Sequence, residues 1–325
     1  MPHAVEPTSL SQAAAAAQRL LQFLNSRCLG RETEAELLVA AFAAGGHVLL
    51  EGTPGLGKTL LVRALSEAVD LSYGRIQCTP DLMPSDITGS EILDQQAGGS
   101  FRFIEGPVFH HVLLVDEINR ATPRAQSALL EAMEERQVTA AGVSRPLPAP
   151  FFVAATQNPI ELEGTYPLPE AQLDRFLLHL SFARPSTAHL ERILAQPDAP
   201  KTVAPILSLN EVQGIQNHAA SLPVTDGQQT TLANIIAASH ADDESAPLAV
   251  REHVRLGASP RAGLAAIQSA RGLALLRGRS HVAPEDLRDA LPHAFRHRLL
   301  LQYETAGSIQ GDEIMAAILD LYPVR

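Results

Sequence analysis

The chain has 325 residues, of which 46% are hydrophobic and 19% are charged, as is ordinary for a globular protein with room for two domains. Its net charge of −11 excludes an overall basic surface that would attract nucleic acid, although a local basic surface stays open. The longest apolar stretch, Leu37 to Ala44, is far shorter than the roughly 20 residues that span a membrane. With two isolated cysteines and no signal-peptide pattern, we expect a cytoplasmic protein without membrane insertion.

The spacing of apolar residues predicts an amphipathic helix over residues 8–30 and a second helix over residues 32–44. Strands and helices then alternate along the chain. The predicted strands are residues 48–51, 74–78, 111–116 and 151–156, and the helices between them are residues 58–69 and 123–135. Such alternation is typical of an α/β fold in which helices cover both faces of a parallel sheet.

Two segments interrupt this alternation and carry hairpin patterns. Residues 90–94 and 100–104 flank a turn that Gly98-Gly99 would supply, and residues 137–139 and 145–147 form a weaker pair. Ordinary surface loops are the alternative for both segments when they are considered alone.

After Pro185 the patterns become helical, without strong strand signals. The predicted helices are residues 190–195, 209–218, 229–240, 261–277, 284–295 and 311–321. We therefore expect an α/β domain over residues 1–185 and an all-helical lid over residues 186–325.

A phosphate-binding loop follows the first predicted strand. Its residues are Gly52, Thr53, Pro54, Gly55, Leu56, Gly57, Lys58 and Thr59. A glycine-rich turn between a strand and a helix directs backbone N–H groups at a polyphosphate, which Lys58 can also reach, while Thr59 can bind Mg²⁺. A glycine-rich turn that happens to contain a lysine is the alternative, but the strand before it and the helix after it favour ATP binding.

Two adjacent acidic residues follow the apolar run at 113–115. Asp116 and Glu117 should lie at the carboxyl edge of the parallel sheet, where ligands bind in open α/β folds. We expect Asp116 to hold Mg²⁺ and Glu117 to polarise the attacking water. Because a loop that only binds nucleotide can dispense with the second acid, the pair favours ATP hydrolysis.

With these motifs in place, the chain resembles the AAA+ ATPases, and among them the MoxR family, over nearly its whole length. The motifs that carry the resemblance are IQCTPDLMPSDITG (residues 76–89), VDEINRA (115–121), ATQNP (155–159), YPLPEAQLDRF (166–176) and GASPRA (257–262). The family has hairpins inserted at the two places where the chain shows its hairpin patterns. The resemblance therefore strengthens both hairpin predictions.

The resemblance implies roles for three further residues. Asn158 would be sensor 1, an amide that contacts the attacking water or the γ-phosphate without adding charge. Arg175 would be the arginine finger that a subunit offers to its neighbour's γ-phosphate, and Arg261 would be sensor 2, reaching the same subunit's nucleotide from the lid. The alternatives are a simple turn at Asn158, a surface ion pair at Arg175 and a water-facing helix start at Arg261.

The implied activity is Mg²⁺-dependent hydrolysis of ATP by a homo-oligomer, expected to be a hexameric ring, that remodels or activates client proteins. In the family such work often involves a von Willebrand A domain partner, here expected on a separate polypeptide, and sometimes serves metal cofactor insertion. One rival is a nucleic-acid motor, which the acidity and the few basic residues of the hairpins disfavour. Another is a nucleotide-gated scaffold with little turnover, which Glu117, Asn158 and Arg175 together disfavour.

Overall fold

Five parallel strands form the central sheet, in the order β2-β5-β8-β1-β9. The computed structural model describes residues 9–94, 100–140, 142–160, 164–195, 204–302 and 309–324. The strands are β1 (Val48–Glu51), β2 (Tyr73–Gln77), β5 (Val112–Asp116), β8 (Phe152–Gln157) and β9 (Leu178–Ser181). Four of them confirm the sequence prediction. The fifth, β9, was not predicted, because Leu178-His179-Leu180-Ser181 is as short as β1 but has neither a continuous apolar run nor a glycine-rich turn after it.

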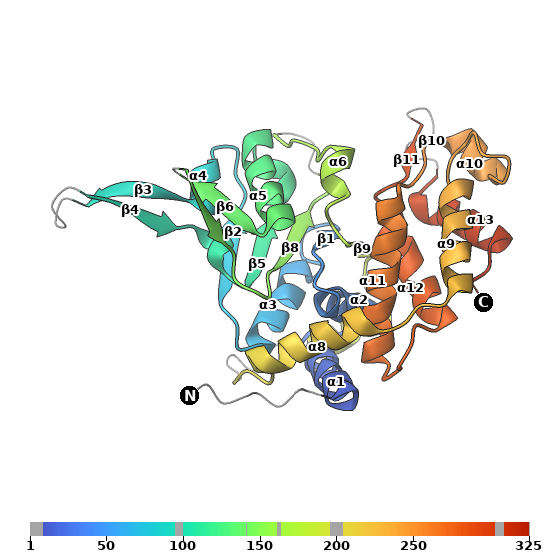
Figure 1. The fold of residues 1–325 in the computed structure, drawn as a ribbon, viewed down its shortest axis with the longest axis horizontal. Helices are drawn as coiled ribbons and strands as arrows, with labels where there is room; N and C mark the ends of the chain where they lie inside the picture. Colours follow the sequence, from blue (N-terminus) through green and yellow to red (C-terminus); the bar gives the residue numbers. More distant parts are fainter. Residues whose placement is uncertain are drawn as a thin grey trace.

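Helices cover both faces of this sheet, as the α/β prediction required (Figure 1). On β5, Val112 and Leu114 pack on one face, while Leu113 and Val115 pack on the other. The helices of this part are α1 (Leu10–Arg27), α2 (Glu32–Ala43), α3 (Lys58–Ala68), α4 (Pro84–Thr88), α5 (Pro123–Glu135) and α6 (Glu170–Leu173). Because both faces are covered, β5 is buried along its whole length and can hold functional groups rigidly at its end.

Both predicted hairpins are present. Strands β3 (Gly89–Asp94) and β4 (Ser100–Glu105) pair in antiparallel fashion, and so do β6 (Gln137–Ala140) and β7 (Val143–Pro146). The expected turn at Gly98-Gly99 lies outside the described residues. The β3–β4 hairpin projects away from the sheet (Figure 1), and Leu93, Phe101 and Ile104 on it are exposed.

The C-terminal part packs against α1 and α2 through a hydrophobic core that continues into the sheet. Its helices are α7 (Thr187–Ala195), α8 (Leu209–Ser221), α9 (Asp226–Ala238), α10 (Leu248–His253), α11 (Pro260–Leu276), α12 (Pro284–Phe295) and α13 (Gly311–Leu321). The lid is helical as predicted, apart from the short antiparallel pair β10 (Val254–Leu256) and β11 (Leu300–Leu301). Strands this short leave no readable period in the sequence. None of the helices in the described ranges is long and apolar enough to cross a membrane.

His47 ties three elements together just before β1. Its Nδ1 accepts a hydrogen bond from the backbone N–H of Val153 at 3.0 Å, and its Nε2 donates to the carbonyl of Met133 at 3.4 Å. Its own carbonyl accepts from Leu177 N at 2.7 Å. Burial lowers the pKa of His47 to about 4, which keeps the ring neutral, as an acceptor at Nδ1 requires.

Acid should therefore destabilise the protein through His47. Its unfolded pKa of 6.5 exceeds its folded value, so the unfolded state takes up the proton first and stability falls as pH drops from 6.5 toward 4. The free energy of unfolding at about pH 7.5 and at about pH 5.5 can be measured by urea denaturation. Its decrease between these two pH values should be about 1.4 kcal/mol smaller in His47→Asn than in the unaltered protein. His281→Asn, which changes an exposed histidine, is the control and should keep the full loss. An equal loss in His47→Asn would contradict the assignment.

Candidate active site

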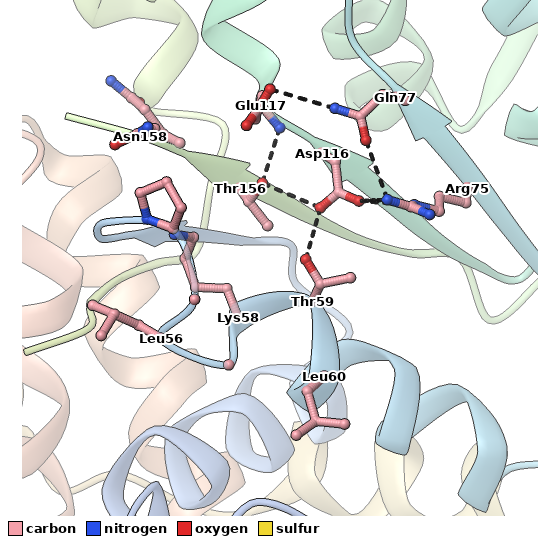
Figure 2. A pocket seen from close by; sticks show the side chains of 14 residues that line it. Leu56, Lys58, Thr59, Leu60, Arg75, Gln77, Asp116, Glu117, Thr156 and Asn158 are labelled. Carbon is pink, nitrogen blue, oxygen red and sulfur yellow. Dashed lines mark hydrogen bonds and ion pairs between the residues drawn. The ribbon is translucent and has the colours of Figure 1, made fainter. Parts of the chain in front are cut away.

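A cavity of about 410 Å³ lies where β1, β5 and β8 end, a size typical of small-molecule sites. It brings together the loop after β1, the acids Asp116 and Glu117 at the end of β5, and Asn158 after β8 (Figure 2). The lining residues are Pro54, Gly55, Leu56, Gly57, Lys58, Thr59, Leu60, Arg75, Gln77, Asp116, Glu117, Thr156, Gln157 and Asn158. The parallel sheet thus gathers groups that lie up to a hundred residues apart in the sequence.

The loop from Gly52 to Thr59 has the backbone of an anion cradle. Gly55 and Gly57 have φ values of 81° and 90°, a region that favours glycine, and α3 begins at Lys58, so that its first turn lines the cavity. Lys58 Nζ donates to the carbonyls of Gly52 and Thr53, the latter at 2.9 Å. Burial lowers the pKa of Lys58 while nearby acids oppose this effect. These donors fit a nucleotide polyphosphate.

Asp116 is buried and both of its oxygens are engaged. Thr59 Oγ1 and Thr156 Oγ1 donate to Oδ1 at 3.1 and 3.3 Å, and the Arg75 guanidinium lies 2.8 Å from Oδ2 (Figure 2). A hydroxyl and a carboxylate oxygen side by side are ligands that Mg²⁺ accepts. Thr59 and Asp116 are therefore the residues that would hold Mg²⁺.

Glu117 has a backbone conformation that is rare outside glycine, with φ 56° and ψ 53°. Such a conformation costs on the order of 1 kcal/mol and is held here by the bond from Glu117 N to Thr156 Oγ1, 2.9 Å long. With this backbone conformation, the Glu117 side chain departs from the regular alternation of side chains between the two faces of β5. The carboxylate then receives bonds from Arg120 at 3.0 Å and from Gln77 at 3.4 Å.

Asn158 is buried at the wall of the cavity, on the strand end next to Glu117 (Figure 2). Its Oδ1 accepts from Ile160 N at 3.4 Å, and its Nδ2 has no hydrogen-bond partner within the described part of the chain. A buried amide donor without a partner is costly and marks a place where a ligand could accept its bond.

Three residues of this cavity that hydrogen-bond the two acids were not predicted from the sequence: Thr156, Arg75 and Gln77. The sequence places Thr156 at the end of a predicted strand and in the ATQNP motif, but indicates no role for its hydroxyl group. Arg75 and Gln77 stand two residues apart on β2, so their side chains share one face of the strand. Two polar residues at alternate positions of a strand are a signal that the sequence contains. Their place beside the acids depends on the strand order, which puts β2 next to β5.

Arg175 and Arg261 lie together in a second cavity, of about 290 Å³, that shares no lining residue with the first. Both guanidinium groups bind the carboxylate of Glu134, at 2.9 and 2.8 Å, and Arg261 also lies 3.4 Å from Asp174. Four arginines and two carboxylates line this cavity, so positive charge is in excess. Arg261 does not face the P-loop of its own chain in this structure, which differs from the expectation for sensor 2.

The two cavities lie at opposite ends of the parallel strands, one at their carboxyl ends and the other at their amino ends. The P-loop leaves the carboxyl end of β1, whereas Arg175 precedes the amino end of β9, which runs parallel to β1. The length of β1 alone separates these ends by about 13 Å at ~3.3 Å per residue. Helix α5 begins six residues after Glu117, and its last turn carries Glu134 into the second cavity. Arg261 donates a hydrogen bond of 2.8 Å to the Glu134 carboxylate, and both side chains line the second cavity.

Lid residues also hold the segment that carries Arg175. Buried Arg298 binds the Asp174 carboxylate at 2.5 Å and donates to the carbonyls of Asp174 and Phe176 at 2.9 and 2.7 Å. His297 Nε2 donates to the Phe176 carbonyl at 3.1 Å. A displacement of the lid would therefore move the backbone on both sides of Arg175.

Two family models match the chain. Residues 47–178 match the ATPase family associated with various cellular activities (AAA), and residues 247–318 match the AAA lid domain. These ranges contain the first cavity and the helix that carries Arg261.

The chain is similar to several characterised and uncharacterised bacterial proteins over most of its length. It is 41% identical to Chaperone MoxR1 of Mycobacterium tuberculosis, covering 88% of this chain and 76% of that protein. It is 38% identical to YeaC of Bacillus subtilis over 94% of both chains, and 30% identical to the protein MoxR of Methylorubrum extorquens over 95% of both.

Solved structures agree with these matches. A candidate ATPase from Cytophaga hutchinsonii is 34% identical and superposes with a TM-score of 0.87 over 96% of both chains. An MCM homologue from Methanopyrus kandleri, 18% identical, superposes with a TM-score of 0.61 over 99% of this chain and 63% of its own, and shares the fold alone.

Proposed function

The chain belongs to the MoxR family of AAA+ ATPases, and we propose that it hydrolyses ATP with Mg²⁺ in sites that a neighbouring subunit completes. The observation that carries the proposal is the single cavity in which the P-loop, Asp116, Glu117 and Asn158 meet. It offers an anion cradle, a pair of metal-binding oxygens, a carboxylate base and a free amide donor. Hydrolysis of a phosphate anhydride needs each of these groups.

Each residue has a role that its position supports. Lys58 leaves the loop carbonyls to bind the β- and γ-phosphates, and the N–H groups at the start of α3 bind the same anion. Thr59 and Asp116 hold Mg²⁺, which supplies positive charge to the phosphates. Glu117 accepts the proton of the attacking water, and Asn158 Nδ2 donates to that water or to the γ-phosphate.

Arg175 and Arg261 serve the nucleotide of the neighbouring subunit in this proposal. Their cavity lies at the edge of the sheet away from their own P-loop and carries an excess of positive charge. A neighbour that docks its carboxyl edge there would place its γ-phosphate against both arginines. This arrangement repeats head to tail and closes as a ring, for which we propose six subunits.

We further propose that the ring acts in the cytoplasm to remodel or activate client proteins, with a separate von Willebrand A domain protein as partner. One relative's name, Chaperone MoxR1, supports this class of work. The projecting β3–β4 hairpin exposes Ile92, Leu93, Phe101 and Ile104, with exposed fractions of 40 to 71%. Apolar side chains gathered on an accessible hairpin suit contact with a polypeptide.

Two substitutions separate nucleotide binding from turnover. Lys58→Ala should abolish binding of a fluorescent ATP analogue, because the loop loses its only cation for the phosphates. Glu117→Gln should bind ATP and hold the ring together while phosphate release falls at least about 100-fold, since the base is lost. Glu252→Gln, at an exposed glutamate of α10, is the control and should behave as the unaltered protein. Turnover by Glu117→Gln at the unaltered rate would disprove the base assignment.

Mixed rings test whether the arginines act between subunits. Arg175→Ala and Lys58→Ala proteins should each be inactive alone, but mixing them should restore some ATPase activity, because each supplies what the other lacks. The same recovery is expected when Arg261→Ala is mixed with Lys58→Ala. If Arg261 instead served its own subunit's nucleotide, that second mixture would stay inactive while the first recovered.

A further inference from the structure

The edge strand β2 carries two polar side chains that point at the active site. Arg75 pairs across the sheet with Leu114, and Gln77 pairs with Asp116, so both side chains lie on one face beside the acids of β5. Ile76 between them faces the opposite core. The Arg75 side chain is 54% exposed at this edge strand, so its role has to be argued from its contacts.

The Arg75 guanidinium contacts two side chains of the active site, Asp116 and Gln77. Its guanidinium lies 2.8 Å from Asp116 Oδ2, and its Nη2 donates to Gln77 Oε1 at 3.1 Å. Because a guanidinium only donates hydrogen bonds, Gln77 has to present its carbonyl oxygen to Arg75. The amide NH₂ of Gln77 then faces Glu117, whose Oε2 it meets at 3.4 Å (Figure 2).

We propose that Arg75 is a positioning residue for hydrolysis, which orients the Gln77 amide and thereby fixes the Glu117 carboxylate relative to Asp116. The inference rests on the proposed function, because it concerns the same site. It adds a physical link between the carboxylate that would hold the metal and the carboxylate that would activate water.

Arg75 is not needed to keep Asp116 in place. Thr59 and Thr156 hold Oδ1 through their hydroxyl groups, and the β5 backbone is buried and paired on both sides. Glu117, by contrast, is also drawn by Arg120, which binds the same Oε2 at 3.0 Å. Without the oriented amide of Gln77, this oxygen keeps its bond to Arg120, whose side chain is 42% exposed, and the carboxylate can move with that side chain. Loss of Arg75 should therefore affect the base more than the binding of Mg²⁺ and ATP.

A double-mutant cycle tests this link with Arg75→Met, Gln77→Leu and the double variant. Each single change should lower kcat about 10-fold, as losses of supporting hydrogen bonds around such sites do. The double variant should fall by the same factor and no further, because both changes remove one chain of contacts. Affinity for mant-ATP in the presence of Mg²⁺ should match the unaltered protein in all three. Arg63→Met, which changes an exposed arginine of α3 paired with Glu67, is the control and should leave kcat unchanged.

Three results would overturn the inference: unaltered kcat in Arg75→Met, a double variant whose loss is the product of the single losses, or loss of Mg²⁺-dependent mant-ATP binding in Arg75→Met. The last would mean that Arg75 supports the metal site itself. Failure of the proposed function is distinguishable, because the unaltered protein would then release no phosphate while mant-ATP binding still reported on the site.

Discussion

The parallel pairing of β1 with β9 is the constraint on which the account depends. Val48 pairs with Leu178 and Glu51 with Ser181, so the two strands point the same way side by side. The P-loop follows one strand and the arginine segment precedes the other, which fixes them at opposite edges of a rigid sheet. An active site that needs both groups has to take them from two copies of the chain.

The remaining parts of the site follow from burial of the sheet. Because β5 and β8 are covered on both faces, their ends hold Asp116, Glu117 and Asn158 with little freedom. The structure accepts a strained backbone at Glu117 and an unpartnered amide at Asn158 within this frame. Costs of this kind persist where surrounding packing is strong, and they concentrate where a ligand acts.

The sequence predicts the parts of the site that are local. The P-loop, the Asp116-Glu117 pair and Asn158 each end an apolar run, and parallel strands bring such ends to one edge without knowledge of the strand order. Arg75, Gln77 and the position of Arg261 depend on which strands are neighbours and on how α5 returns across the sheet. Those facts arise from packing between distant segments, which short-range patterns do not encode. The short strands β10 and β11 were missed because two or three residues carry no clear period, and β9 was missed because no continuous apolar run or turn signal accompanies it.

Arg298 and His297 extend the constraint to the lid, since they bind the backbone around Arg175. The lid, the arginines and the sheet edge thus form one unit that a neighbour would meet. The central claim is that catalysis needs two subunits, and its most direct test is ATPase activity per subunit over a dilution series, with assembly followed by analytical ultracentrifugation. The account predicts that activity per subunit falls in step with dissociation. Constant activity per subunit in dilute, monomeric protein would contradict it.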